Sequence, residues 1–147
     1  MDNNHKWYKH YHSRTSGAPL QPDNLVIVYL AHPFTGNMQA NLRRVEKIAQ
    51  NIITLSLKGS FSHFYAPLIP HFLFSVFNEE RNPEIRPITE ALSSRLVQTC
   101  DELWIVSYQI SRGMQLEIQA ANDAGIPIKK WPEILKLLPQ IEDALSE

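Results

Sequence analysis

Two short runs of apolar residues constrain the fold of this chain more than any other feature. LVIVYLA covers residues 25–31, and DELWIVS covers residues 101–107 with four apolar residues in succession. Strands buried on both faces have this composition, and they belong to parallel sheets that helices cover on both sides. The sequence therefore predicts two buried strands in a layered α/β domain.

Helical and extended patterns alternate along the rest of the chain. Apolar residues recur at helical spacing from Leu42 to Ile53, with Asn37 as a candidate N-cap. The other expected elements are a strand in 63–70, a charged and aromatic excursion in 71–87, a helix over about 88–99, a helix from Ser111 closed by Gly125, a strand in 126–131, and a helix that starts at Pro132 and kinks or breaks at Pro139. Strands alternating with helices predict a mainly parallel sheet of four or five strands with helices on both faces.

Composition narrows the class of protein. The chain has 147 residues, 44% of them hydrophobic, and a net charge of −1, which fits one folded domain and argues against a generic nucleic-acid or membrane-surface binder. Residues 1–23 are expected to form a polar arm, mobile or packed on a subunit neighbour, and residues 24–147 the domain. The stretch HKWYKHYH in the arm mixes cations and aromatics, which also suits nucleic acid.

Cysteine and hydropathy patterns indicate the compartment. Cys100 is the only cysteine and precedes an apolar run, so it is expected to be a small buried hydrophobe. No Cys/His spacing resembles a zinc site, and the sequence has neither a signal peptide nor an apolar stretch of about 18 residues. A cytoplasmic location and no membrane contact are therefore expected.

Two polar loops follow the buried strands. HPFTGN comes after 25–31, and SYQISRGMQLE comes after the strand in 101–107. Because ligands of parallel α/β sheets bind beyond the carboxyl ends of the strands, the sequence predicts a site between these loops.

Glu117 is the most informative carboxylate near these loops. It lies about one turn into a helix among apolar neighbours, where partial desolvation would raise its pKa and make it a candidate base or nucleophile. A carboxylate can attack an anomeric carbon to give a covalent glycosyl-enzyme. The alternative is an ordinary first-turn Glu that interacts favourably with the helix dipole.

Other candidates in the two loops each carry a structural alternative. Ser111, Arg112 and Gly113 precede a helix start and could bind an anion, or Ser111 could be a plain N-cap beside a solvent-facing Arg. His32 could be a catalytic base or a base-stacking group, and His71 could line the same crevice; both could equally be structural loop residues. Thr35, Gly36 and Asn37 repeat the hydroxyl-and-amide arrangement, Asp101 could cap or orient a loop, and Trp104 is expected in the core.

Four segments together resemble the nucleoside 2-deoxyribosyltransferase-like superfamily. They are VYLAHPFTGN, PLIPH, CDELWIVS and SRGMQLEIQAANDAGIPI, and the resemblance covers roughly residues 25–130. They are closest to a bacterial and phage branch with a Y-L-A-H-P opening. The resemblance implies a three-layer flavodoxin-like or Rossmann-like sandwich, usually as a homodimer or larger assembly. It also implies cleavage of the N-glycosidic bond of nucleosides or 5′-monophosphates through a Glu nucleophile, which matches Glu117, without a metal or organic cofactor.

The resemblance makes two positions informative. Transferases that act on free nucleosides tend to carry Asp six residues before the nucleophile, whereas monophosphate hydrolases carry Ser, as Ser111 here. The match favours a nucleotide and hydrolysis. Active members carry an acid about 24 residues before the nucleophile, where this chain has Ser93. Either His32 or Glu90 assists departure of the base instead, or the site binds without turnover.

The sequence therefore predicts hydrolysis or base transfer on a nucleotide or nucleoside, with Glu117, His32 and Glu90 as catalytic candidates. The alternative is a catalytically weak nucleotide sensor in a bacterial or phage defence-type assembly. The expected substrate-binding residues are Tyr29, Ala31, Pro33, Phe34, Thr35, Gly36, His71, Ser93, Ser111, Arg112, Gly113 and Met114.

Overall fold

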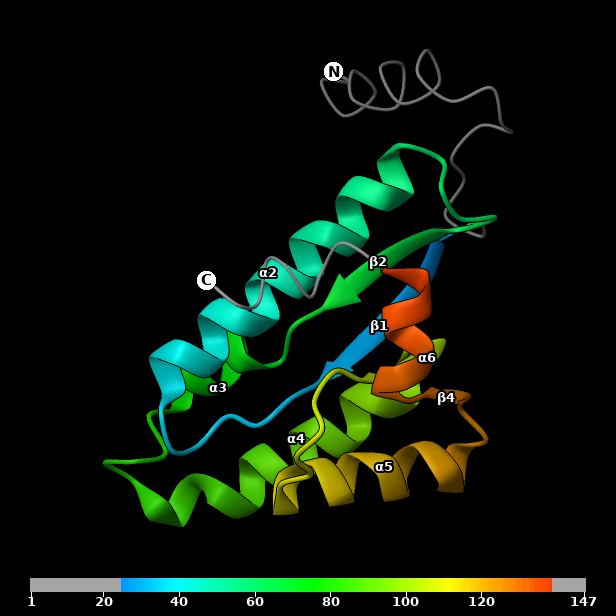
Figure 1. Cartoon of the computed structure of the whole chain (residues 1–147). Helices are drawn as coiled ribbons and strands as arrows, with labels where there is room; N and C mark the ends of the chain where they lie inside the picture. The colour runs from blue at the N-terminus through cyan, green and yellow to red at the C-terminus, as the bar shows by residue number, and fades with distance from the viewer. Residues whose placement is uncertain (1–24, 139–147) are drawn as a thin grey trace, which may run out of the picture.

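A computed structural model describes residues 25–138, which form a three-layer α/β sandwich (Figure 1). The sheet contains β1 (Leu25–Ala31), β2 (Phe64–Leu68), β3 (Glu102–Ile105) and β4 (Ile128–Lys129), all parallel, in the order β2-β1-β3-β4. This order agrees with the first four strands of a flavodoxin-like sheet. The expected arm at 1–23 and the expected kink at Pro139 lie outside the described residues.

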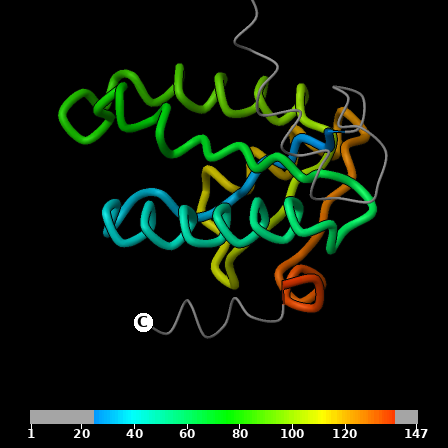
Figure 2. Tube along the Cα trace, turned by 90° about the horizontal axis from the view of Figure 1, so that it is seen from above, coloured from blue at the N-terminus to red at the C-terminus, as the bar shows by residue number. Residues whose placement is uncertain are grey.

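The helices and the two central strands divide the core into two clusters. The helices are α2 (Met38–Leu57), α3 (His71–Phe77), η3 (Pro83–Ile85, a 3₁₀ turn), α4 (Arg86–Thr99), α5 (Arg112–Ala124) and α6 (Trp131–Leu137). Val28, Leu30 and Trp104 pack with α2 and α6, whereas Tyr29 and Ala31 face α4 and α5. Figure 2 shows α6 on the same side as α2, with α4 on the other side. This alternation confirms strands buried on both faces.

Most expected elements are confirmed, with shifted ends. Asn37 caps α2, accepting from the Ala40 N–H, and Gly125 ends α5 in the left-handed conformation that glycine adopts without strain. Cys100 and Trp104 are buried as expected. The excursion at 71–87 contains α3 and η3, which the sequence patterns did not predict as helical. No helix within residues 25–138 is long and apolar enough to span a bilayer.

Ser56 of α2 supplies hydrogen-bond partners for backbone groups of the edge strand β2. Its hydroxyl accepts from the Tyr65 N–H (3.1 Å) and donates to the Tyr65 carbonyl (3.4 Å). These side-chain bonds are buried and tie the last turn of α2 to the sheet edge.

Replacing Ser56 with Ala should lower the free energy of unfolding by about 1–3 kcal/mol, because both Tyr65 backbone groups lose their partner. Urea denaturation measures the change. Ser62→Ala is the control, since Ser62 is exposed, and it should change stability by less than about 0.5 kcal/mol. Equal losses in the two variants would contradict the assignment.

Candidate functional site

The loop after β1 begins with His32, which is 5% exposed. Its Nδ1 lies 2.9 Å from the Pro33 carbonyl oxygen, and because a carbonyl only accepts, Nδ1 is the protonated nitrogen that donates. Burial lowers the pKa of His32, helped by the nearby Arg44 charge and opposed by the bond to Pro33. A neutral ring with its proton on Nδ1 leaves a lone pair on Nε2.

His71, the first residue of α3, holds this loop in place. Its Nε2 donates to the carbonyl oxygens of His32 (3.0 Å) and Pro33 (3.2 Å). Burial lowers the pKa of His71 to about 4, so the ring is neutral near pH 7, and its Nδ1 is buried without a partner. His71 therefore acts as a two-point clamp on the backbone at residues 32–33.

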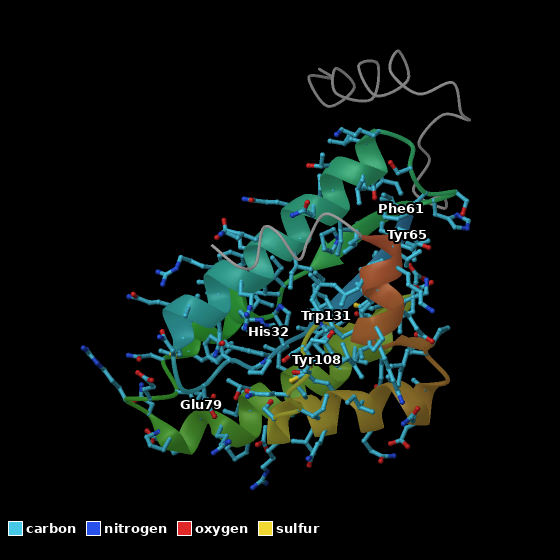
Figure 3. The ribbon with its side chains drawn as sticks, in the orientation of Figure 1. His32, Phe61, Tyr65, Glu79, Tyr108 and Trp131 are labelled. Carbon is cyan, nitrogen blue, oxygen red and sulfur yellow. The ribbon has the colours of Figure 1, made fainter. Side chains whose placement is uncertain are left out.

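Aromatic rings line the same side of the site. Phe34 lies edge-on to His71 (5.3 Å between centroids) and to Phe74 (5.9 Å), and the His32 and His71 rings lie 5.9 Å apart. Figure 3 shows His32 beyond the end of β1, away from the Phe61 and Tyr65 end of the sheet. The loop after β1 and α3 thus form an aromatic wall, made of His32, Phe34, His71 and Phe74.

Glu117 lies in the second turn of α5 and is 6% exposed. Burial raises its pKa to about 8, an effect that the Tyr29 hydroxyl partly opposes. Its Oε2 is buried and has no hydrogen-bond partner. The first turn of α5 contains no acidic residue, so the alternative of a first-turn Glu interacting with the helix dipole is wrong.

Tyr29 lies beneath Glu117 on β1 and is fully buried. Burial and the nearby Glu117 carboxyl raise the pKa of the Tyr29 hydroxyl, which is therefore neutral. No hydrogen bond of standard geometry joins the two groups, although each influences the ionisation of the other.

The start of α5 presents hydrogen-bond donors. Ser111 is the N-cap, as expected, because its Oγ accepts from the Met114 N–H (3.2 Å). Its hydroxyl proton therefore remains free to donate. The Arg112 side chain is 74% exposed, and its Nε lies 4.0 Å from Glu90 Oε1.

Ion pairs and one buried hydroxyl line the α4 side. Arg86 Nε lies 3.3 Å from Glu90 Oε1 and 3.4 Å from Glu79 Oε1. Ser93 is 4% exposed and donates to the Glu90 carbonyl (3.0 Å). In Figure 3, Glu79 and His32 occupy the same end of the molecule.

These groups surround one cavity of about 170 Å³ at the carboxyl end of the sheet. It brings together most of the predicted site residues: His32, Phe34, Thr35, His71, Glu90, Ser93, Ser111, Arg112, Gly113, Met114 and Glu117. Tyr29, Ala31, Pro33 and Gly36 do not line it. The volume is below the roughly 300–1,000 Å³ of pockets that enclose a drug-sized ligand, so the cavity would enclose only part of a nucleotide.

Sequence reasoning missed four lining residues, Phe74, Glu79, Arg86 and Thr89. Arg86 and Thr89 share one face of α4 with Glu90 and Ser93, so helical spacing from the two predicted residues could have found them. Phe74 and Glu79 depend on the unpredicted helix α3. Within residues 25–138, no group of three His, Cys, Asp or Glu side chains could hold a metal ion.

The fold is an α/β sandwich. In its cavity, the Glu117 carboxyl of α5 faces the aromatic wall. The family model described as Domain of unknown function (DUF7768) matches residues 26–131, and the chain belongs to that family. No curated protein and no solved structure matches the sequence.

Burial of Glu117 should make the protein less stable as the pH rises. Its ordinary pKa is 4.5 and its folded pKa about 8, so between these values the folded state holds a proton that the unfolded chain releases. The stabilising contribution is complete below about pH 4.5 and is lost as the pH rises through 8. At pH 9, Glu117→Gln should exceed the wild type in unfolding free energy by on the order of 5 kcal/mol.

Denaturant unfolding at pH 5, 7 and 9 measures this difference. Glu80→Gln is the matched control, because Glu80 is exposed, and it should follow the wild type at every pH. A gap between Glu117→Gln and the wild type that does not grow with pH would contradict the burial effect.

Proposed function

We propose that this protein cleaves the N-glycosidic bond of a nucleoside 5′-monophosphate or nucleoside, with Glu117 as the nucleophile. The observation that carries the proposal is the buried Glu117 carboxyl, which lines the cavity with an oxygen that has no partner. The ionised carboxylate attacks C1′, so that an O–C1′ bond forms while the C1′–N bond breaks and its electrons leave with the base. Water, or a second base, then displaces Glu117 from C1′.

The start of α5 is suited to bind the 5′-phosphate of the proposed substrate. A helix N-terminus attracts anions through its free N–H groups and its dipole. The free hydroxyl proton of Ser111 and the exposed guanidinium of Arg112 lie at this start and line the cavity. The resemblance to monophosphate hydrolases at Ser111 favours the same substrate.

The aromatic wall supports a base on the other side of the cavity. Phenyl rings such as those of Phe34 and Phe74 can stack on or pack against any nucleobase, because every base has a π-face. With the base on this wall and the phosphate at α5, the sugar spans the space beside Glu117.

The departing base needs a proton, and the cavity is poor in groups that supply one. His32 presents a lone pair at Nε2, Glu90 is an ion-paired carboxylate that accepts, and Ser93 occupies the position of the acid in the related superfamily. Proton transfer typically contributes about 10²–10⁴-fold, so we expect slow turnover.

Incubation with the four common ribo- and deoxyribonucleoside 5′-monophosphates should release free base, detected by chromatography. Glu117→Gln should abolish release, because an amide is not a nucleophile for C1′. Glu80→Gln should release base at the wild-type rate. The proposal fails if no nucleotide or nucleoside yields base, and the role of Glu117 fails if the Gln variant keeps activity.

Ser93→Asp should raise the rate of base release by about 10-fold or more, because it returns a carboxylic acid to the cavity near the leaving group. Burial beside Glu117 favours the protonated, donating form of the new acid. The rate under single-turnover conditions measures the effect. Ser94→Asp, one position further along α4 and outside the cavity lining, is the control. An unchanged or lower rate in folded Ser93→Asp would contradict this role for position 93.

A second candidate is a nucleotide-binding subunit without turnover. The absence of a carboxylic acid at position 93 favours it, and so does the apolar surface of α3, where Val76 is 81% exposed and Phe72 and Leu73 are nearly half exposed. Exposed apolar patches commonly mark contacts with other proteins. Nucleotide binding measured by calorimetry, with no base release after prolonged incubation, would select this candidate.

A further inference from the structure

Two histidines fix the hydrogen-bonding character of the aromatic wall. The proton of His32 is on Nδ1, because that nitrogen donates to the Pro33 carbonyl, so Nε2 can only accept. The proton of His71 is on Nε2, which donates to two carbonyls, so its Nδ1 can likewise only accept. Both rings line the cavity, and the lowered pKa of each keeps it neutral near pH 7.

Of these two acceptors, His32 Nε2 is the one available to a ligand. Nδ1 of His71 is fully buried. His32 Nε2 makes no hydrogen bond and is not fully buried. Thr35 also lines the cavity near His32, and its hydroxyl can donate or accept, so it does not select between ligands. Nε2 of His32 is therefore the polar atom of the aromatic wall that can select between ligands.

The start of α5, on the opposite side of the cavity, has the reverse character. Ser111 retains a donor proton and Arg112 carries donors only, whereas the guanidinium of Arg86 is paired with the carboxylates of Glu79 and Glu90. A ligand that satisfies both sides combines an anionic or acceptor group at α5 with an N–H donor at His32. A nucleotide meets this requirement when its base carries an amino group.

We infer that His32 reads the nucleobase and favours bases with an exocyclic amino group, such as adenine and cytosine, over their oxo counterparts hypoxanthine and uracil. An amino N–H donates to Nε2, whereas a carbonyl oxygen in the same place sets lone pair against lone pair and leaves both groups unsatisfied. This inference rests on the proposed function, since it assumes a nucleotide with its base at the aromatic wall. It requires no proton transfer from His32.

Two matched pairs of ligands test the inference: AMP against IMP, and CMP against UMP. The members of each pair differ at the base by an amino group in place of an oxo group, together with the accompanying ring protonation. Isothermal titration calorimetry should give a Kd about tenfold or more lower for AMP than for IMP, and for CMP than for UMP. That is the size expected when one buried polar contact is left unmatched.

Variants assign the preference to a residue. His32→Gln should reduce the ratio of the two Kd values to near one, because a Gln amide can turn either its N–H₂ or its carbonyl toward the base. His63→Gln is the control, since His63 is exposed and outside the cavity lining, and it should keep the wild-type ratio. Thermal melting checks that both variants fold.

A second measurement needs no variant. In ¹⁵N-histidine spectra of the wild type, AMP should perturb an unprotonated Nε2 resonance more strongly than IMP does. Equal or tighter binding of IMP and UMP overturns the inference while leaving the proposed function intact. Retention of the preference in folded His32→Gln overturns the role of His32. If none of the four nucleotides binds, the inference falls, whereas the proposed function is decided by base release from nucleosides and the other nucleotides.

Discussion

The pairing of β1 with β3 is the constraint on which the cavity depends. The two strands run parallel and are bonded at both ends: the Val106 N–H donates to the Ala31 carbonyl (3.0 Å), and Asp101 accepts from the Ile27 N–H (2.8 Å) and donates its own N–H to the Ile27 carbonyl (2.9 Å). Because the strands end together, the loop after β1 and the start of α5 must face each other. Asp101 was expected to cap or orient a loop, and it instead holds the backbone of Ile27 within β1.

The two walls that this pairing brings together differ in chemistry. The side formed by the β1 loop and α3 carries rings and nitrogen lone pairs, and the side formed by α4 and α5 carries hydroxyl and guanidinium donors with their carboxylate partners. Glu117 stands between a neutral tyrosine beneath it and the open cavity. A buried carboxyl in that position lowers stability at high pH, and groups with perturbed pKa values of this kind are common at functional sites.

The sequence predicted the fold and the composition of the cavity better than its chemistry. The runs at 25–31 and 101–107 identified β1 and β3, because burial on both faces leaves an unbroken apolar pattern. The seven-residue helix α3 was missed, since two turns are too short to show a reliable period and its aromatic residues favour no single state. The state of Glu117 depends on how Tyr29, α4 and α5 pack around it, and the tautomers of His32 and His71 depend on carbonyl positions. Neither can be deduced from residue types and spacing.

The way His71 holds the loop has a consequence for how such a site can diversify. Its two hydrogen bonds go to main-chain carbonyls, not to the side chains of residues 32 and 33. These two bonds therefore do not depend on which side chain stands at position 32, although His32 adds its own hydrogen bond to the Pro33 carbonyl. If His32 reads the base as proposed, ligand preference and the His71 clamp belong to separate residues, and a change at position 32 would retune what the cavity accepts while the clamp remains.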